Sequence, residues 1–309
     1  MFAAIYALIL GALPVDRFVD RDSYLAYVDG SLAILVLNSS NGIAGLLTNE
    51  PLWLLVNILF SSFLDTENCV RAIIGISAFL VAFVTLRNNP RHIFLLVLFL
   101  LLPQVLKNYV IHLRQGLAIA VFMAGWFSIS RSWRWTLIMM CPFIHASFFF
   151  IILFMFLDKA LVSVRLSASL RLFNYVAAGL LFSFSATWLA GALGARQGDE
   201  YQAASVETSG IGFLFWLLFT FLYILQGSRF MKANAVSFSV LVFYLTGYFF
   251  LPVAARIFES ALLLILLSGL KLTSYRKLCF FMLFGLYFIA QWLPRLSSPG
   301  FGWGVENYM

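Results

Sequence analysis

The chain has 309 residues, of which 62% are hydrophobic, 17% aromatic and only 11% charged. Soluble domains are about half apolar and about a quarter charged, so this composition excludes a soluble globular protein and predicts an integral membrane protein. The formal net charge of +7 does not indicate nucleic-acid binding, because the basic residues follow the charge asymmetry of a membrane protein.

The first apolar stretch, residues 2–14, has no basic segment before it and no small-residue cleavage site. We therefore predict a short first span that is retained, and not a signal peptide. Residues 31–48 and 51–64 follow, and the polar run 38–42 interrupts the first of them. The topology of residues 31–65 stays open.

Most of the remaining chain consists of apolar runs. A crossing needs about 17–25 residues, and the clear candidates are roughly 72–86, 93–106, 115–130, 173–193, 210–227, 235–253, 257–270 and 278–293. With no soluble domain and no internal repeat, the sequence predicts an all-α polytopic membrane protein. We expect about ten to eleven transmembrane helices in a single integral membrane domain, residues 1–309.

The basic residues gather in one set of short connections. That set holds twelve of the 20 basic residues and only one of the 13 acidic residues, Asp158. The positive-inside rule assigns this set to the cytoplasm. Its members are Arg87, Arg91, Arg131, Arg134, Lys159, Arg165, Arg171, Arg229, Lys232, Lys271, Arg276 and Lys277.

This assignment places residues 131–135 and 158–172 on the same side, with only residues 136–157 between them. Two helices of about eleven residues reach only about 16 Å each, which is too short for two full crossings. We therefore predict a re-entrant segment near 136–157, broken near Pro142, with His145 close to its turn. The alternative is one full crossing with a local violation of the charge rule.

Polar residues beside the spans are the candidates for chemistry, because ionisable groups at membrane depth are costly. The outer loop 16–24 has acids and arginines spaced four apart, which predicts either local ion pairs or a functional cluster. Glu50 precedes Pro51, an ordinary helix start. Arg114 and Gly116 lie at a junction of two spans, where Arg can bind phosphate and Gly permits close approach.

Two further places lie deeper or later in the chain. His145 stands within a run of Phe and Ile, a setting that suits either a base or a satisfied structural histidine. Arg256 and Glu259 are three apart, so they could pair, or Arg256 could hold a pyrophosphate. The loop 194–209 is net acidic and carries Tyr201, which could bind sugar hydroxyls.

Taken in order, these places resemble the EpsG family of exopolysaccharide polymerases, relatives of the Wzy O-antigen polymerases. The most specific part is Arg-Gln-Gly-Leu-Ala followed about thirty residues later by His-Ala-Ser. The matching residues are Asp22 and Tyr24, Glu50 to Trp53, Arg114 to Ala118, His145 with Ser147, and Arg256 with Phe258. The chain departs from the pattern in its short first span and in Arg17–Arg21, which replaces a Gly-rich approach to Asp22.

The resemblance implies a membrane glycosyltransferase of the bacterial cytoplasmic membrane. It would transfer a growing glycan from polyprenyl pyrophosphate to another lipid-linked repeat on the outer face. In this reading His145 is the base, with Asp22 or Glu50 in reserve, and arginines stabilise the leaving pyrophosphate. We predict His145, Arg114 and Asp22 as catalytic, and Arg256, Glu50, Tyr24 and Tyr201 as substrate-binding.

No cofactor is implied, and no ligand cluster argues for a metal. The three cysteines, Cys69, Cys141 and Cys279, are interpreted as small apolar side chains. The expected partners are the polyprenyl-pyrophosphate-linked oligosaccharide, membrane lipids and a chain-length regulator as a further candidate, with no nucleic acid. Two other functions stay open: a flippase of lipid-linked oligosaccharide, and a membrane ligase or acyltransferase.

Overall fold

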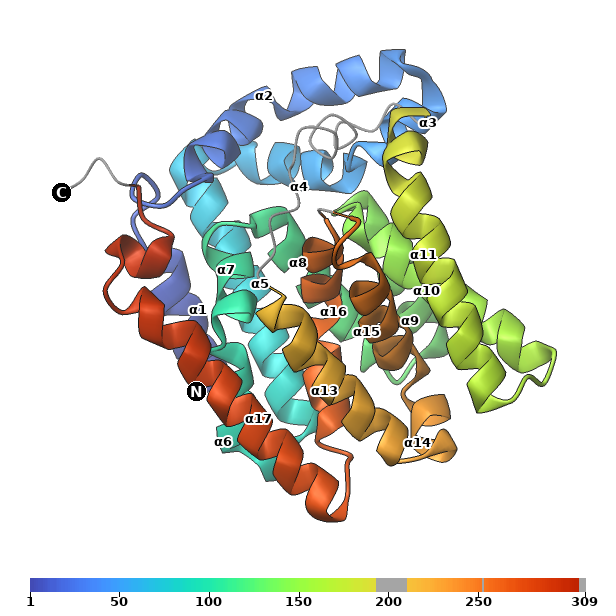
Figure 1. Cartoon of the computed structure of the whole chain (residues 1–309). Helices are drawn as coiled ribbons and strands as arrows, with labels where there is room; N and C mark the ends of the chain where they lie inside the picture. Colours follow the sequence, from blue (N-terminus) through green and yellow to red (C-terminus); the bar gives the residue numbers. More distant parts are fainter. Residues whose placement is uncertain (193–209, 252, 306–309) are drawn as a thin grey trace. The chain divides into compact units, whose positions relative to one another are not determined.

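The computed structural model describes residues 1–192, 210–251 and 253–305 (Figure 1). Every regular element in these ranges is a helix, and the only extended pairing in them is one isolated bridge between Phe18 and Gly304. The chain packs as two compact units. Unit 1 comprises Met1–Ala146 and Tyr287–Met309, and unit 2 comprises Ser147–Leu286.

Unit 1 is built around the long helix α5, which packs against α1, α2 and α8. Gly11 of α1 and Gly75 of α5 face each other, and the absence of side chains lets the two backbones approach closely. The helices of unit 1 are α1 (Phe2–Ala12), α2 (Arg21–Ser40), α3 (Gly42–Thr48), α4 (Pro51–Ser61), α5 (Thr66–Asn88), α6 (Ile93–Leu100), α7 (Pro103–Val110), α8 (Leu113–Trp126) and α9 (Arg131–Met140). Short 3₁₀ turns lie at Pro90–His92, Cys141–Phe143, Leu293–Arg295 and Pro299–Gly302.

Two sharp bends in unit 1 occur just before prolines. The pair α3 and α4 bends by 70° before Pro51, and the pair α6 and α7 bends by 68° before Pro103. Proline has no N–H to donate into a preceding turn but fits the first position of the next helix. The predicted polar interruption also ends a helix, since α2 stops at Ser40 and Gly42 takes a φ of 86°. The bend between α3 and α4 forms the corner in which Glu50 lies.

Unit 2 surrounds α16, which is buried from Ile257 to Gly269. Hydroxyl groups join its helices within the apolar core: Ser237 bonds Ser268 at 2.7 Å, and Tyr223 donates to the Ile265 carbonyl at 2.5 Å. Its helices are α10 (Ser147–Ser163), α11 (Ala168–Ala192), α13 (Ile211–Leu225), α14 (Ser228–Ala233), α15 (Ala235–Gly247) and α16 (Ala254–Gly269). Helix α17 (Ser274–Trp292) begins in unit 2 and ends in unit 1.

Within the described ranges, two helical stretches are long and apolar enough to cross a membrane, Thr66–Asn88 and Ser274–Arg295. The number rises to four if each bent pair forms one span. The predicted class, an all-α polytopic membrane protein, is confirmed. The count of ten to eleven crossings stays a prediction, as does the interpretation of residues 1–309 as a single domain.

The predicted break near Pro142 is present. Helix α9 ends at Met140, the 3₁₀ turn Cys141–Phe143 follows, and α10 begins at Ser147. His145 lies between the turn and α10, as expected. Because α9 belongs to unit 1 and α10 to unit 2, the re-entrant path of residues 136–157 stays a prediction.

Candidate functional site

Three of the predicted site residues meet inside unit 1, although they are far apart in the sequence. Oε2 of Glu50 lies 2.5 Å from Nη1 of Arg114, and Oε1 lies 2.8 Å from Nδ1 of His145. The backbone N–H of Ala146 also donates to Oε1, at 3.2 Å. Glu50 and His145 are buried, and the side chain of Arg114 keeps 19% of its exposure. We call Glu50, Arg114 and His145 the Glu50 cluster.

The backbone of Glu50 explains how its carboxylate reaches this position. Glu50 separates α3 from α4 and has φ 57° and ψ 52°, in the left-handed region. A non-glycine residue there costs about 1–3 kcal/mol and persists only where its surroundings hold it. Pro51, which follows it, disfavours the ordinary helical conformation at this position. The strained corner is thus held by the contacts of the Glu50 carboxylate.

Two tyrosines of α2 lie against Arg114. The guanidinium carbon lies 5.2 Å from the centre of the Tyr27 ring, a distance suited to a cation–π contact. Tyr24 interacts electrostatically with Arg114 and packs edge-on against the buried Trp53. Tyr24, predicted as a substrate-binding residue, is therefore a neighbour of the Glu50 cluster. The positive charge of Arg114 is shared with Glu50, an arrangement that sequence analysis did not predict.

Gly116 shows why a glycine stands in the Arg114–Ala118 segment. A Cβ atom at this position would lie 2.0 Å from the backbone oxygen of Asn108 at the end of α7. Only glycine admits so close an approach, and Ala118 is fully buried nearby on α8. The expectation that small residues here let a neighbouring helix come close is confirmed. This packing fixes the start of α8, which carries Arg114.

The remaining predicted site residues are Asp22, Arg256 and Tyr201. Asp22 is exposed on the first turn of α2, two residues before Tyr24 and therefore on roughly the opposite side of that helix. Arg256 and Glu259 lie on α16 in unit 2; Arg256 is exposed and Glu259 is buried. Tyr201 lies outside the described residues. The roles of Asp22, Arg256 and Tyr201 stay predictions.

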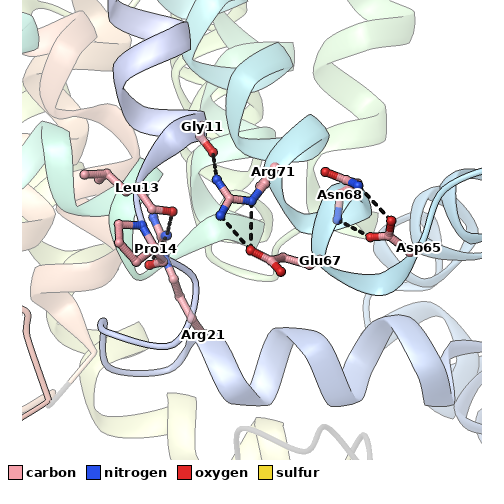
Figure 2. Close-up of polar contacts among 8 residues, drawn as sticks. All are labelled: Gly11, Leu13, Pro14, Arg21, Asp65, Glu67, Asn68 and Arg71. Carbon is pink, nitrogen blue, oxygen red and sulfur yellow. Dashed lines mark hydrogen bonds and ion pairs between the residues drawn. The ribbon is translucent and has the colours of Figure 1, made fainter.

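Sequence analysis missed Arg21, which is completely buried. Figure 2 shows its guanidinium at the end of α1, where Nη1 donates to the Leu13 and Pro14 carbonyls at 3.2 and 3.0 Å. Nε donates to the Val110 carbonyl at 2.8 Å, and the Phe18 ring lies 4.8 Å away. Asp16 and Asp20, like Arg17 and Arg21, are four residues apart, and this spacing suggested ion pairs between neighbouring acids and arginines. Pro14 was a better indication, because a proline just after the first apolar helix marks a helix end, where the last carbonyls have no helical partners.

A second arginine, Arg71 on α5, also caps α1. It donates to the Gly11 carbonyl at 3.1 Å and pairs with Glu67 at 2.6 Å (Figure 2). Burial, reinforced by the charge of Arg71, lowers the pKa of Arg21 to about 10, so Arg21 still carries its charge at neutral pH. At the start of α5, backbone and side-chain hydrogen bonds from Asn68 hold the pKa of Asp65 below its usual value.

The Glu50 cluster has the composition of an acid–base site. An imidazole ring with one nitrogen held by a carboxylate can use its other nitrogen to accept a proton, and a neighbouring guanidinium can stabilise an anion. Among the described residues, no group of three or more His, Cys, Asp and Glu side chains is placed to hold a metal ion.

Comparisons with known proteins give one match. No curated protein and no solved structure matches the chain. The model of the EpsG family matches residues 1–303, which is nearly the whole sequence. The chain therefore belongs to the EpsG family.

Proposed function

We propose that this membrane protein is an exopolysaccharide polymerase that acts on lipid-linked sugar repeats. It would transfer a growing glycan from polyprenyl pyrophosphate to a hydroxyl of a second lipid-linked repeat, on the extracytoplasmic face. Membership of the EpsG family supports the general activity. The observation that carries the proposal is the Glu50 cluster, where a histidine and an arginine that are 31 positions apart share one carboxylate.

The reaction assigns a role to each member of the cluster. His145 takes the proton from the acceptor hydroxyl, whose oxygen forms the new bond to the anomeric carbon of the donor. The bond between that carbon and the phosphate oxygen breaks, and its electron pair leaves with polyprenyl pyrophosphate. Arg114 uses one nitrogen on Glu50 and retains further N–H groups that can bind the leaving diphosphate.

The remaining sequence predictions complete this proposal. Arg256 of unit 2 is proposed to bind phosphate, and Tyr24 and Tyr201 are proposed to bind sugar hydroxyls. Asp22 is a reserve acid or base on the outer loop. The distribution of Lys and Arg supports an outward-facing site, because the segments that carry Arg114 and Glu50 lie outside the strongly basic set of connections.

A strain lacking this gene, complemented with His145→Ala, tests the proposal. General-base catalysis contributes about 10²–10⁴-fold, so we expect long surface polysaccharide to disappear. Single lipid-linked repeats should still reach the outer face, where loss of a flippase would leave none. His92→Ala, at a partly exposed histidine near α6, is the matched control and should restore normal chain length.

Immunoblotting of membranes establishes whether each variant is present in equal amount. Long chains made by His145→Ala at wild-type level would overturn the proposed role of His145. Absence of single repeats from the outer face would favour a flippase.

A further inference from the structure

We propose that Glu50 is the positioning residue of this site: it fixes the tautomer and orientation of His145 and does not bind the sugar. This inference rests on the proposed function and changes the role that the sequence alone suggested for Glu50. It assigns Glu50 to the support of the base, and leaves substrate contact to His145 and Arg114.

The first argument comes from the oxygens of Glu50. Oε1 accepts hydrogen bonds from His145 Nδ1 and from the Ala146 N–H, and Oε2 accepts one from Arg114 Nη1. Both carboxylate oxygens therefore serve protein groups, and the side chain is 6% exposed. A carboxylate that binds a sugar needs at least one oxygen directed at the substrate. Glu50 directs its oxygens at the two residues that would perform the chemistry.

The second argument concerns the proton on His145. An ionised carboxylate can only accept hydrogen bonds, so the contact with Oε1 places the ring proton on Nδ1. The lone pair then lies on Nε2, the nitrogen that must take the proton of the acceptor hydroxyl. The pairing of Glu50 with Arg114 favours the ionised carboxylate that this tautomer requires. The same division of roles occurs in hydrolase triads, where a carboxylate orients the histidine.

The third argument is the charge balance during the reaction. Before the proton transfer, the charges of Glu50 and Arg114 cancel and the base His145 carries no proton on Nε2, so the cluster has no net charge. After the transfer, the imidazolium gives the cluster one positive charge, while the departing diphosphate gains one negative charge. Glu50 thus stabilises the imidazolium, and the whole cluster becomes cationic as the leaving group becomes more anionic.

The fourth argument is the backbone on both sides of the contact. Glu50 is held in the left-handed region, and His145 lies in the non-helical residues between the Cys141–Phe143 turn and α10. By binding the Ala146 N–H as well as the imidazole, Glu50 fixes both the backbone and the ring of this segment. Such strain is found where a functional group must be held in one position.

The experiment measures kcat and KM of the full-length protein in liposomes, with the lipid-linked repeat as both donor and acceptor. Glu50→Gln retains the shape of the side chain but offers an N–H₂ group or a neutral oxygen in place of the carboxylate. By analogy with hydrolase triads, kcat should fall about 10²–10⁴-fold. KM should change by less than about threefold, because no uniform substrate contact is lost.

A double variant separates positioning from an independent role. Residues that act as one unit are strongly non-additive, so Glu50→Gln should cause less than about a threefold further loss in a His145→Ala background. Glu50→Asp is shorter by one methylene group and can reach only one of its two side-chain partners. It should lower kcat less than Glu50→Gln, and it serves as the test if Glu50→Gln does not accumulate.

Glu67→Gln is the matched control, because Glu67 is an exposed acid of unit 1 that pairs with an arginine outside the site. Its kcat should equal that of wild type. A large rise in KM for Glu50→Gln, or an additional loss in the His145→Ala background, would overturn the positioning role. If His145→Ala is inactive and Glu50→Gln is fully active, only this inference fails; if His145→Ala keeps full activity, the proposed base fails as well.

Discussion

Two arginines of unit 1, one buried and one partly exposed, are held in different ways. Arg114 faces a carboxylate and aromatic rings, and its side chain keeps 19% of its exposure. Arg21 has no exposure and binds three backbone carbonyls together with the face of Phe18. The first arginine is paired but can still reach a ligand. The second is enclosed, and its Nη2 has no hydrogen-bond partner among the described residues.

The difference separates a charge used for chemistry from a charge used for folding. Burial of an ion costs several kcal/mol unless other groups compensate. Arg21 finds its compensation at the C-terminal end of α1, where unpaired carbonyls carry partial negative charge. Arg114 finds it in Glu50, which leaves the pair neutral and close to His145. The same substitution at both positions should therefore give different phenotypes.

Arg114→Lys should reduce activity far more than the same substitution at Arg21. Lysine can neutralise Glu50 but presents a point charge, and it cannot hold Glu50 and a phosphate oxygen in the fork geometry of a guanidinium. Removing one such donor from an anion-stabilising site costs about 10²–10³-fold in kcat. We expect kcat in the liposome assay to fall by that factor. The abundance and melting temperature of the variant should equal those of wild type. Activity within about threefold of wild type would contradict the role of Arg114 in binding the leaving diphosphate.

Arg21→Lys should instead weaken the fold. Hydrogen bonds to charged groups contribute about 1.5–3 kcal/mol each, and an ammonium group cannot reach all three carbonyls. We expect a loss of about 2–4 kcal/mol in the free energy of unfolding, visible as a lower melting temperature in detergent. The activity of each folded molecule should stay within about threefold of wild type. A normal melting temperature with low kcat would place Arg21 in the reaction.

Glu50 and His145 could be singled out as candidates from the sequence, because each of them breaks a local pattern. Glu50 precedes a proline, and His145 interrupts an apolar run next to Pro142. Gly116 marks a close approach whose partner, the Asn108 carbonyl, only the structure identifies. The sequence did not predict that Glu50 would join Arg114 to His145, since contacts over 64 and 95 positions depend on how the helices bend and pack.

Arg21 could not be predicted in the same way. Its neighbours Asp20 and Asp22 suggested a solvated loop with local ion pairs, whereas its actual partners are backbone carbonyls, which every residue possesses. Two helix breaks were predicted correctly from the sequence, whereas the number of crossings stays a prediction. The breaks near residues 38–42 and 142 are present, but several apolar runs form helices too short to span a bilayer alone, among them α6 and α7.

Arg71→Gln should have the smallest effect on stability. It tests how much the arginines at the end of α1 contribute to folding. Its pair with Glu67 is exposed, and such pairs contribute about 0–1 kcal/mol because water and salt screen them. Loss of the bond to the Gly11 carbonyl is partly offset, since the charge of Arg71 disfavours the charged form of its neighbour Arg21. We expect a decrease in the free energy of unfolding below about 1 kcal/mol, measured by melting in detergent at low and high salt.

The double variant Arg21→Lys/Arg71→Gln tests whether the two arginines stabilise α1 independently. At the end of α1, Arg71 binds the Gly11 carbonyl and Arg21 binds the Leu13 and Pro14 carbonyls (Figure 2). The two side chains repel each other, so their effects should not add. Each single change weakens this repulsion, which the double variant can lose only once, so the combined loss of stability should be larger than the sum of the single losses. Strict additivity would mean that the two arginines stabilise α1 independently, and that Arg21 owes its enclosed state to the carbonyls alone.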